Sequence, residues 1–209
     1  YEIAQCLVGS EMCIRDSVVM LYTGFEDYLI TRNGGTKMTS FERWQANLGK
    51  IQLPHWDELP DLDLYVDQVV ALVNDRAMGM GIAPITKSMI NNYVKKGIIM
   101  APVKKKYSRY QLAAVIMIAM LKGSFSIPSI HEGIKQVTIN NYPQQAYDRF
   151  VDLMNARLHN ESAAVDNQLD PVNDQLINYV VETLFNRMQA AELLKTMQET
   201  QQPRDVKKG

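Results

Sequence analysis

The chain has 209 residues, and its 22 Lys and Arg residues nearly balance 23 Asp and Glu residues, which leaves a formal net charge of -1 at pH 7. No apolar run approaches the ~20 residues that a membrane-spanning helix needs, so the sequence predicts no transmembrane segment. The two cysteines, Cys6 and Cys13, both lie near the start. The body of the chain therefore offers no disulfide framework, thiolate metal site or nucleophilic cysteine.

The first 37 residues read as a leader that is foreign to the native protein. Residues 6–17 resemble the conceptual translation of a transposase sequencing adapter, and residues 33–37 can be encoded by a bacterial ribosome-binding site ahead of a start codon. We therefore expect Met38 to be the native start and 18–37 to be untranslated region that was read through. A genuine N-terminal extension is the alternative. No secretion signal precedes Met38 and the rest is free of cysteine, which favours a cytoplasmic protein.

Two helices are predicted before the middle of the chain. The first spans 39–51, with Thr39 or Ser40 as its cap. The second spans 61–78 and carries aspartates at its N-terminal end, where the helix dipole favours negative charge. We expect these acids to lie away from the basic residues that follow.

The loop between these helices, 53–60, holds the only acidic and histidine side chains that suggest chemistry. His55 and Asp57 could bind a metal, but a lone histidine near one carboxylate is more often a surface or capping group. Asp57 and Glu58 have no basic partner nearby in sequence. The chain also lacks a Gly-rich phosphate loop, a nucleophile elbow and a paired-His motif. We expect no enzyme activity, no metal and no cofactor.

A short amphipathic helix is predicted over 86–96. Thr86 can cap it, and Gly97 can end it because glycine enters the left-handed conformation without a Cβ penalty. Its apolar side chains recur at spacings of three and four and share one face: Met89, Ile90, Tyr93 and Val94. The opposite face carries Lys87, Ser88, Asn91, Asn92 and Lys95. Amide, hydroxyl and ammonium groups suit base edges and the phosphates beside them.

The charges of the chain are strongly segregated around this helix. Residues 76–131 contain no Asp or Glu. They contain nine bases: Arg76, Lys87, Lys95, Lys96, Lys104, Lys105, Lys106, Arg109 and Lys122. A basic block is the electrostatic footprint of a protein that binds a polyanion. The alternative interpretation is an ordinary solvated helix followed by a lysine-rich turn.

Further helices follow to the end of the chain. The most apolar one is predicted over 108–122, and Ser126 caps the next, with Pro128 in its first turn. We then expect a helical C-terminal region over 143–200 and a disordered tail over 201–209. Its long helix, 171–197, has an apolar stripe that must be buried, either against the same chain or in a homodimer.

The segment 89–130 resembles the winged helix-turn-helix of MerR-type bacterial transcription regulators. The resemblance rests on Met89-Ile90-Asn91-Asn92-Tyr93, Gly97-Ile98-Ile99, Pro102, Lys106-Tyr107-Ser108, Leu112, Leu121-Lys122-Gly123, Phe125-Ser126-Ile127 and Ile130. It implies that the first of these pieces belongs to the recognition helix, that 103–106 form the wing and that Tyr107-Ser108 opens the next helix. The wing is shorter than is usual in that family. Residues 44–136 also resemble an uncharacterised bacterial family, a domain of unknown function, through the Leu-Pro-x-Trp-x-x-Leu-Pro segment and the Leu-x-Leu-Tyr that follows it, over 53–65.

The sequence therefore predicts a mainly α fold, with a MerR-like winged helix-turn-helix domain over 38–142 that has a minimal wing and is followed by C-terminal helices. We expect a bacterial, DNA-binding transcription regulator that meets double-stranded DNA. A protein-interaction module or a small-molecule sensor on the same scaffold is the alternative. The residues expected to contact DNA are Thr86, Lys87, Ser88, Asn91, Asn92, Lys95, Lys96, Lys104, Lys105, Lys106, Tyr107 and Arg109.

Overall fold

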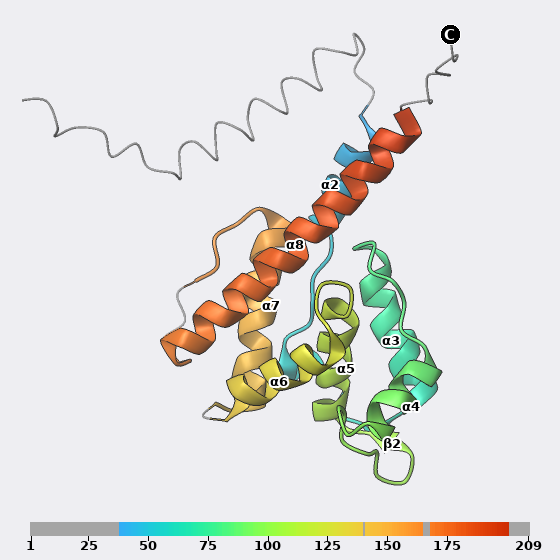
Figure 1. Ribbon diagram of the computed structural model, residues 1–209, viewed down its shortest axis with the longest axis vertical. Coiled ribbons are helices and arrows are strands. Elements are labelled where there is room, and N and C mark those ends of the chain that lie inside the picture. The colour runs from blue at the N-terminus through green and yellow to red at the C-terminus, as the bar shows by residue number, and fades with distance from the viewer. Residues whose placement is uncertain (1–37, 140, 165–167, 201–209) are drawn as a thin grey trace, which may run out of the picture. The chain divides into compact units, whose positions relative to one another are not determined.

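The computed structural model describes residues 38–139, 141–164 and 168–200. The described part from Thr39 onward belongs to one compact unit. Its elements are α2 (Ser40–Leu48), the 3-10 helix η1 (Trp56–Glu58), β1 (Leu64–Tyr65), α3 (Val66–Met78), α4 (Lys87–Lys95), β2 (Lys106–Tyr107), α5 (Arg109–Leu121), α6 (Ile127–Thr138), α7 (Pro143–His159) and α8 (Pro171–Thr200) (Figure 1). The predicted mainly α class is confirmed. The predictions for 1–37 and 201–209 lie outside the described residues.

The helix starts follow the capping residues that the sequence offers. Thr39 and Glu42 form a reciprocal capping box at the start of α2. The side chains of Thr86 and Ser126 each accept a hydrogen bond from a backbone N–H in the first turn of α4 and α6. The carboxylate of Asp170 does the same for α8. These bonds satisfy amides that would otherwise be orphaned, which explains why the predicted starts are confirmed.

The predicted helix over 61–78 is wrong in its first five residues. Leu64 and Tyr65 form β1 and pair antiparallel with Tyr107 and Lys106 of β2, so α3 begins only at Val66. The partners are more than forty residues apart along the chain, and a local pattern does not reveal such a pairing. The early aspartates of this segment consequently lie outside the helix.

Helix α5 is the centre of the hydrophobic core. Nine of its thirteen residues are buried, and α3 and α6 both pack on it. The buried residues are Gln111, Leu112, Ala113, Val115, Ile116, Ile118, Ala119, Met120 and Leu121. A helix that is apolar on nearly every side belongs inside a protein. Burying each large aliphatic side chain contributes about 1.5–3 kcal/mol.

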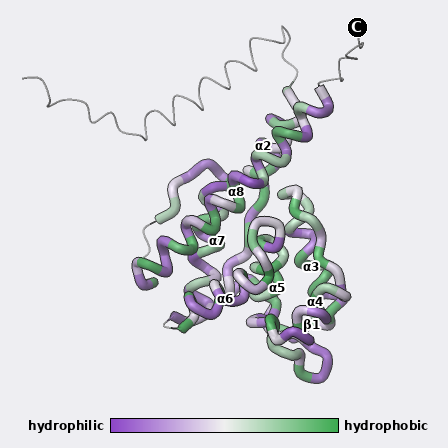
Figure 2. The backbone as a smooth tube through the Cα atoms, in the orientation of Figure 1, coloured by the Kyte–Doolittle hydropathy of each residue, from purple (hydrophilic) through white to green (hydrophobic). Residues whose placement is uncertain are grey.

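Helices α7 and α8 pack against one another and close the unit (Figure 1). Figure 2 shows hydrophilic and hydrophobic stretches that alternate along α8. The buried residues of α8 include most of its predicted stripe, namely Ile177, Val181, Leu184, Phe185 and Met188. The predicted stripe is thus covered largely within the chain, while Leu194 at its end remains 56% exposed.

Contacts also cross the predicted boundary between 142 and 143. Helix α2 packs on the C-terminal part of α8, where the hydroxyls of Ser40 and Thr196 are hydrogen-bonded at 2.9 Å. Helix α7 packs on η1, and its Asp148 accepts a hydrogen bond from the backbone N–H of Trp56 at 2.6 Å. Every helix in the described part of the chain is too short or too polar to cross a bilayer.

Candidate nucleic-acid interface

Helix α4 is held by its apolar face. Ile90 and Tyr93 are buried, and Met89 and Val94 pack against the core. Burial also raises the pKa of the Tyr93 hydroxyl. The predicted assignment of these four residues to one inward face is confirmed, because spacings of three and four bring them together on a helix.

The opposite face of α4 is exposed to solvent. The exposed residues are Thr86, Lys87, Ser88, Asn91, Asn92 and Lys95. Together with Met89 they line an open hollow on the surface. We call these exposed residues the α4 face. The face offers hydrogen-bond donors and acceptors from the amides and hydroxyls, and positive charge from the ammonium groups.

The end of α4 is a Schellman motif. The N–H of Gly97 donates to the carbonyl of Val94, and the N–H of Ile98 donates to the carbonyl of Tyr93 at 2.9 Å. Gly97 has a φ of +70°, which explains why glycine is needed at this position. Lys96 forms the C-cap and is exposed.

A two-residue turn follows at 103–106. Val103 and Lys106 face one another across an antiparallel bridge, and the N–H of Lys106 donates to the carbonyl of Val103 at 2.9 Å. Lys104 and Lys105, between them, have φ values of +49° and +65°. Two positive φ values are the mark of a type I′ turn, which usually takes Asn-Gly. The turn therefore projects two exposed lysines at a cost in backbone strain.

The turn, which we call the lysine turn (103–106), is tied to the rest of the fold at both ends. Lys106 pairs with Tyr65 in the two-stranded sheet, and its ammonium group lies 5.5 Å from the centroid of the Tyr65 ring. On the other side, the buried amide of Gln111 donates to the carbonyls of Met100 and Ala101, each at 2.9 Å. The exposed lysines thus project from a fixed backbone. In Figure 1 the loop that joins α4 to β2 lies at the same end of the unit as α4.

Two of the residues expected at this interface lie elsewhere. The side chain of Tyr107 is 3% exposed, and burial raises the pKa of its hydroxyl. The Arg109 guanidinium is 3.0 Å from a carboxylate oxygen of Asp61 and 3.6 Å from one of Asp57. Tyr107 and Arg109 were expected to contact DNA, and neither side chain is free to do so in this structure. The first belongs to the core and the second to an ion-pair cluster.

The acids are also closer to the basic residues than the sequence predicted. The ammonium group of Lys87 lies 3.0 Å from a carboxylate oxygen of Asp67 in α3, with both side chains exposed. Arg109 pairs with Asp57, although the loop was expected to have no basic partner. The segregation along the sequence breaks down in space because α3 and the η1 loop fold back beside α4 and β2. An exposed ion pair is worth roughly 0–1 kcal/mol, so the pairing with Asp67 holds Lys87 only weakly.

Sequence reasoning missed the clamp that positions the start of α4. The side-chain amide of Asn74 in α3 both donates to the carbonyl of Ile85 and accepts from its N–H, at 2.9 and 2.8 Å. Ile85 is 1% exposed, so its backbone groups need these partners. A polar side chain beside the apolar face of α3, next to the buried Val73, was the available signal.

The two side chains considered as metal ligands are engaged separately. His55 Nε2 is 2.8 Å from Asp152, and this hydrogen bond raises the pKa of the imidazole. Asp57 faces Arg109 instead. Within the residues that the structure describes, no group of three or more His, Cys, Asp or Glu side chains is placed to hold a metal ion.

Comparison with known proteins finds one family match, in the central part of the chain. Residues 54–150 match the family described as "Domain of unknown function (DUF1836)". This confirms the predicted resemblance to a domain of unknown function and provides no support for the MerR-type resemblance. No curated protein and no solved structure matches.

Proposed function

We propose that the protein is a DNA-binding transcription regulator whose α4 face and lysine turn contact double-stranded DNA. The observation that carries the proposal is the two-sided construction of α4. Ile90 and Tyr93 fix one side in the core, while the other side presents amides, hydroxyls and ammonium groups to solvent. A helix held in this way can enter the major groove, which admits one α-helix and displays a distinct pattern for each base pair.

The arrangement around α4 supports a MerR-like winged helix-turn-helix. Helix α3 packs on α4, as the first helix of such a motif packs on the second. The lysine turn then takes the place of the wing, and the Asn74 clamp holds α4 against α3. On this interpretation α4 is the recognition helix.

The lysines divide into those with partners and those without. Lys95, Lys96, Lys104 and Lys105 make no ion pair with any described residue. Lys87 and Lys106 have exposed or partly exposed partners. Contact with phosphates by four to six lysines predicts that log affinity falls with log salt at a slope of roughly -4 to -5.

Reading of the bases is assigned to the asparagines of the α4 face. Asn91 and Asn92 are both exposed, and adjacent helix residues point ~100° apart, so one of them faces the bases. An Asn amide can bond adenine through both its oxygen and its nitrogen, which is worth about 1–3 kcal/mol of discrimination. The lysines hold phosphates and carry no sequence information directly.

The test is selection of bound duplexes from a random DNA pool with the full chain, followed by binding to the selected and scrambled duplexes over a range of salt. Asn91→Ala or Asn92→Ala should relax preference at one base position and spare non-specific binding. Changing Lys104, Lys105 and Lys106 to Ala should weaken binding to all duplexes and flatten the salt slope.

Matched controls come from residues outside the α4 face and the lysine turn. The α2 change Asn47→Ala should leave base preference intact. A triple change of Lys50, Lys135 and Lys195 to Ala removes as many lysines, one just after α2, one from α6 and one from α8, and should leave the slope nearly unchanged. Absence of binding at low salt would contradict the proposal and favour a protein-interaction module on the same scaffold.

The proposed regulator acts in the cytoplasm, where it meets DNA. A homodimer through 171–197 would use the part of α8 that stays exposed, including Val172 and Tyr179, which are 71% and 61% exposed. Sedimentation of the full chain at several concentrations tests the dimer.

A further inference from the structure

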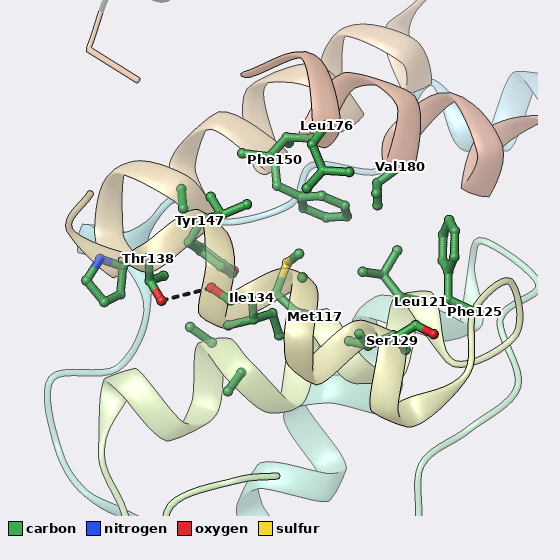
Figure 3. A pocket seen from close by; sticks show the side chains of 18 of the residues that line it. Met117, Leu121, Phe125, Ser129, Ile134, Thr138, Tyr147, Phe150, Leu176 and Val180 are labelled. Atoms are coloured by element: carbon green, nitrogen blue, oxygen red, sulfur yellow. Dashed lines mark hydrogen bonds between the residues drawn. The ribbon is translucent and has the colours of Figure 1, made fainter. Parts of the chain in front are cut away.

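A cavity that opens to solvent lies between helices of the unit, and no residue of the α4 face lines it. Its volume is about 310 Å³, and its walls come from η1, α5, α6, α7 and α8. Figure 3 shows Met117 of α5, Ile134 of α6, Phe150 of α7 and Val180 of α8 around this space. Trp56 of η1 completes the wall.

The lining contains no charged side chain. Two of its hydroxyls are already used, because Thr138 donates to the carbonyl of Ile134 at 2.8 Å and Tyr147 donates to the carbonyl of Pro54 at 3.1 Å. An ion inside this cavity would lose its hydration and find no partner, which is very costly. The cavity therefore selects an uncharged, largely apolar molecule.

Two polar groups of the lining residues have no hydrogen-bond partner among the described residues. Neither the indole N–H of Trp56 nor the hydroxyl of Tyr110 makes a hydrogen bond within the described ranges 38–139, 141–164 and 168–200. Trp and Tyr usually present one polar group on an apolar body. A ligand with a single hydroxyl or carbonyl would fit this chemistry.

Gly133 lines the cavity from α6, with open space beside it. It lies in the middle of α6, on the same face as Ile130, Ile134 and Val137. A Cβ added at Gly133 would meet no atom within 4 Å. A larger side chain can therefore be placed at this position to test whether the space beside it is used.

The cavity is accessible and has a definite size. Tyr110, Ser129 and Leu176 line it and are exposed, so a ligand can enter from solvent. An engineered apolar cavity of about 150 Å³ holds one benzene ring. The volume here is roughly twice that, which corresponds to two fused rings or a compact aliphatic molecule of that size.

We propose that this cavity binds an uncharged apolar small molecule of about two-ring size that carries at most one or two hydrogen-bonding groups. Binding at this site stands independently of the DNA proposal. An effector role would rest on that proposal. Trp56 and Tyr110 directly neighbour Asp57 and Arg109, whose ion pair lies beside the strand that carries the lysine turn.

The test is calorimetric titration of the full chain, without DNA, by 2-naphthol and by naphthalene-2-sulfonate. These probes share the two-ring body and differ in charge. We expect one site for 2-naphthol with a dissociation constant of about 10–100 µM. The sulfonate should bind at least about 30-fold more weakly because its charge has no partner in the cavity.

Substitutions in the wall locate the binding. Gly133→Phe fills the cavity and should weaken 2-naphthol binding at least about tenfold, while Gly133→Ala makes the same backbone change without filling it and should bind like the wild type. Ala114→Leu fills the cavity from α5 and should also weaken binding, which guards against a failure of Gly133→Phe to fold. Circular dichroism checks that each variant is helical.

Three results would overturn the ligand site: no saturable binding of 2-naphthol, equal binding of the sulfonate, or a folded cavity-filling variant that binds like Gly133→Ala. The DNA titrations are separate measurements. If the chain binds 2-naphthol but not DNA, only the proposed function is contradicted. If it binds DNA but not 2-naphthol, only the ligand site is contradicted.

Discussion

The lysine turn affects both the stability of the fold and the proposed binding to DNA. Substitutions in the turn can separate the two effects. Lys104 and Lys105 both have positive φ, which costs a residue with a Cβ roughly 1–2 kcal/mol. Asn-Gly is the preferred pair for a type I′ turn. Replacing Lys104 by Asn and Lys105 by Gly should relieve about 2 kcal/mol of strain. Glycine has more conformational freedom in the unfolded chain, which reduces this stabilisation by about 0.5–1 kcal/mol.

The net gain should be about 1–1.5 kcal/mol, which corresponds to a rise in Tm of about 2–6 °C for a chain of this size. The same double substitution removes two phosphate contacts, so the salt slope should move toward zero by about 1.8. The protein would become more stable and bind DNA less well.

The matched control is Lys104→Ala with Lys105→Ala. Alanine removes the same charges but keeps a Cβ at each positive φ, so the slope should change equally while Tm does not rise. Differential scanning calorimetry and fluorescence anisotropy measure the two effects. The reasoning is refuted if the Asn-Gly protein is no more stable than the Ala-Ala protein, or if neither changes the salt slope.

Three further predictions concern other parts of the fold. The hydrogen bond that the His55 imidazole donates to Asp152 raises the pKa of His55, so the stabilisation from this pair is complete below pH ~6.5 and is lost as the pH rises through the higher folded-state pKa. The Tm difference between wild type and His55→Gln should therefore shrink over that range, and a constant difference would contradict the assignment. Asn74→Ala strands a buried backbone N–H and C=O and should cost about 1–3 kcal/mol in urea unfolding, whereas a cost below about 0.5 kcal/mol would show that the clamp is dispensable. Arg149 is 7% exposed, and its guanidinium lies 2.6 Å from a carboxylate oxygen of Asp174. Arg149→Met should lower the free energy of unfolding by about 1–3 kcal/mol, which is less than breaking a fully buried pair costs because the carboxylate is partly exposed. Adding Asp174→Asn should restore part of the loss, and no recovery would argue against the ion pair.

The sequence by itself determined the elements whose causes are local. The capping hydroxyl of Thr86, the spacing of Ile90 and Tyr93, and Gly97 at the end predict α4 and its inward face, and the structure agrees. The continuous apolar run over 112–121 likewise identifies α5 as a core helix. These signals act within one or two helical turns, so an isolated reading of the chain suffices.

Only the tertiary structure decided the features that join distant parts of the chain. The pairing of β1 with β2 buries Tyr107, and the return of the η1 loop and the segment before β1 brings Asp57 and Asp61 to Arg109. The sequence of α8 also left open whether its apolar stripe packs on the same chain or on a second copy. An apolar stripe indicates that it must be buried, but not which surface buries it. The cavity depends on five elements at once, and the space beside Gly133 is a property of their packing.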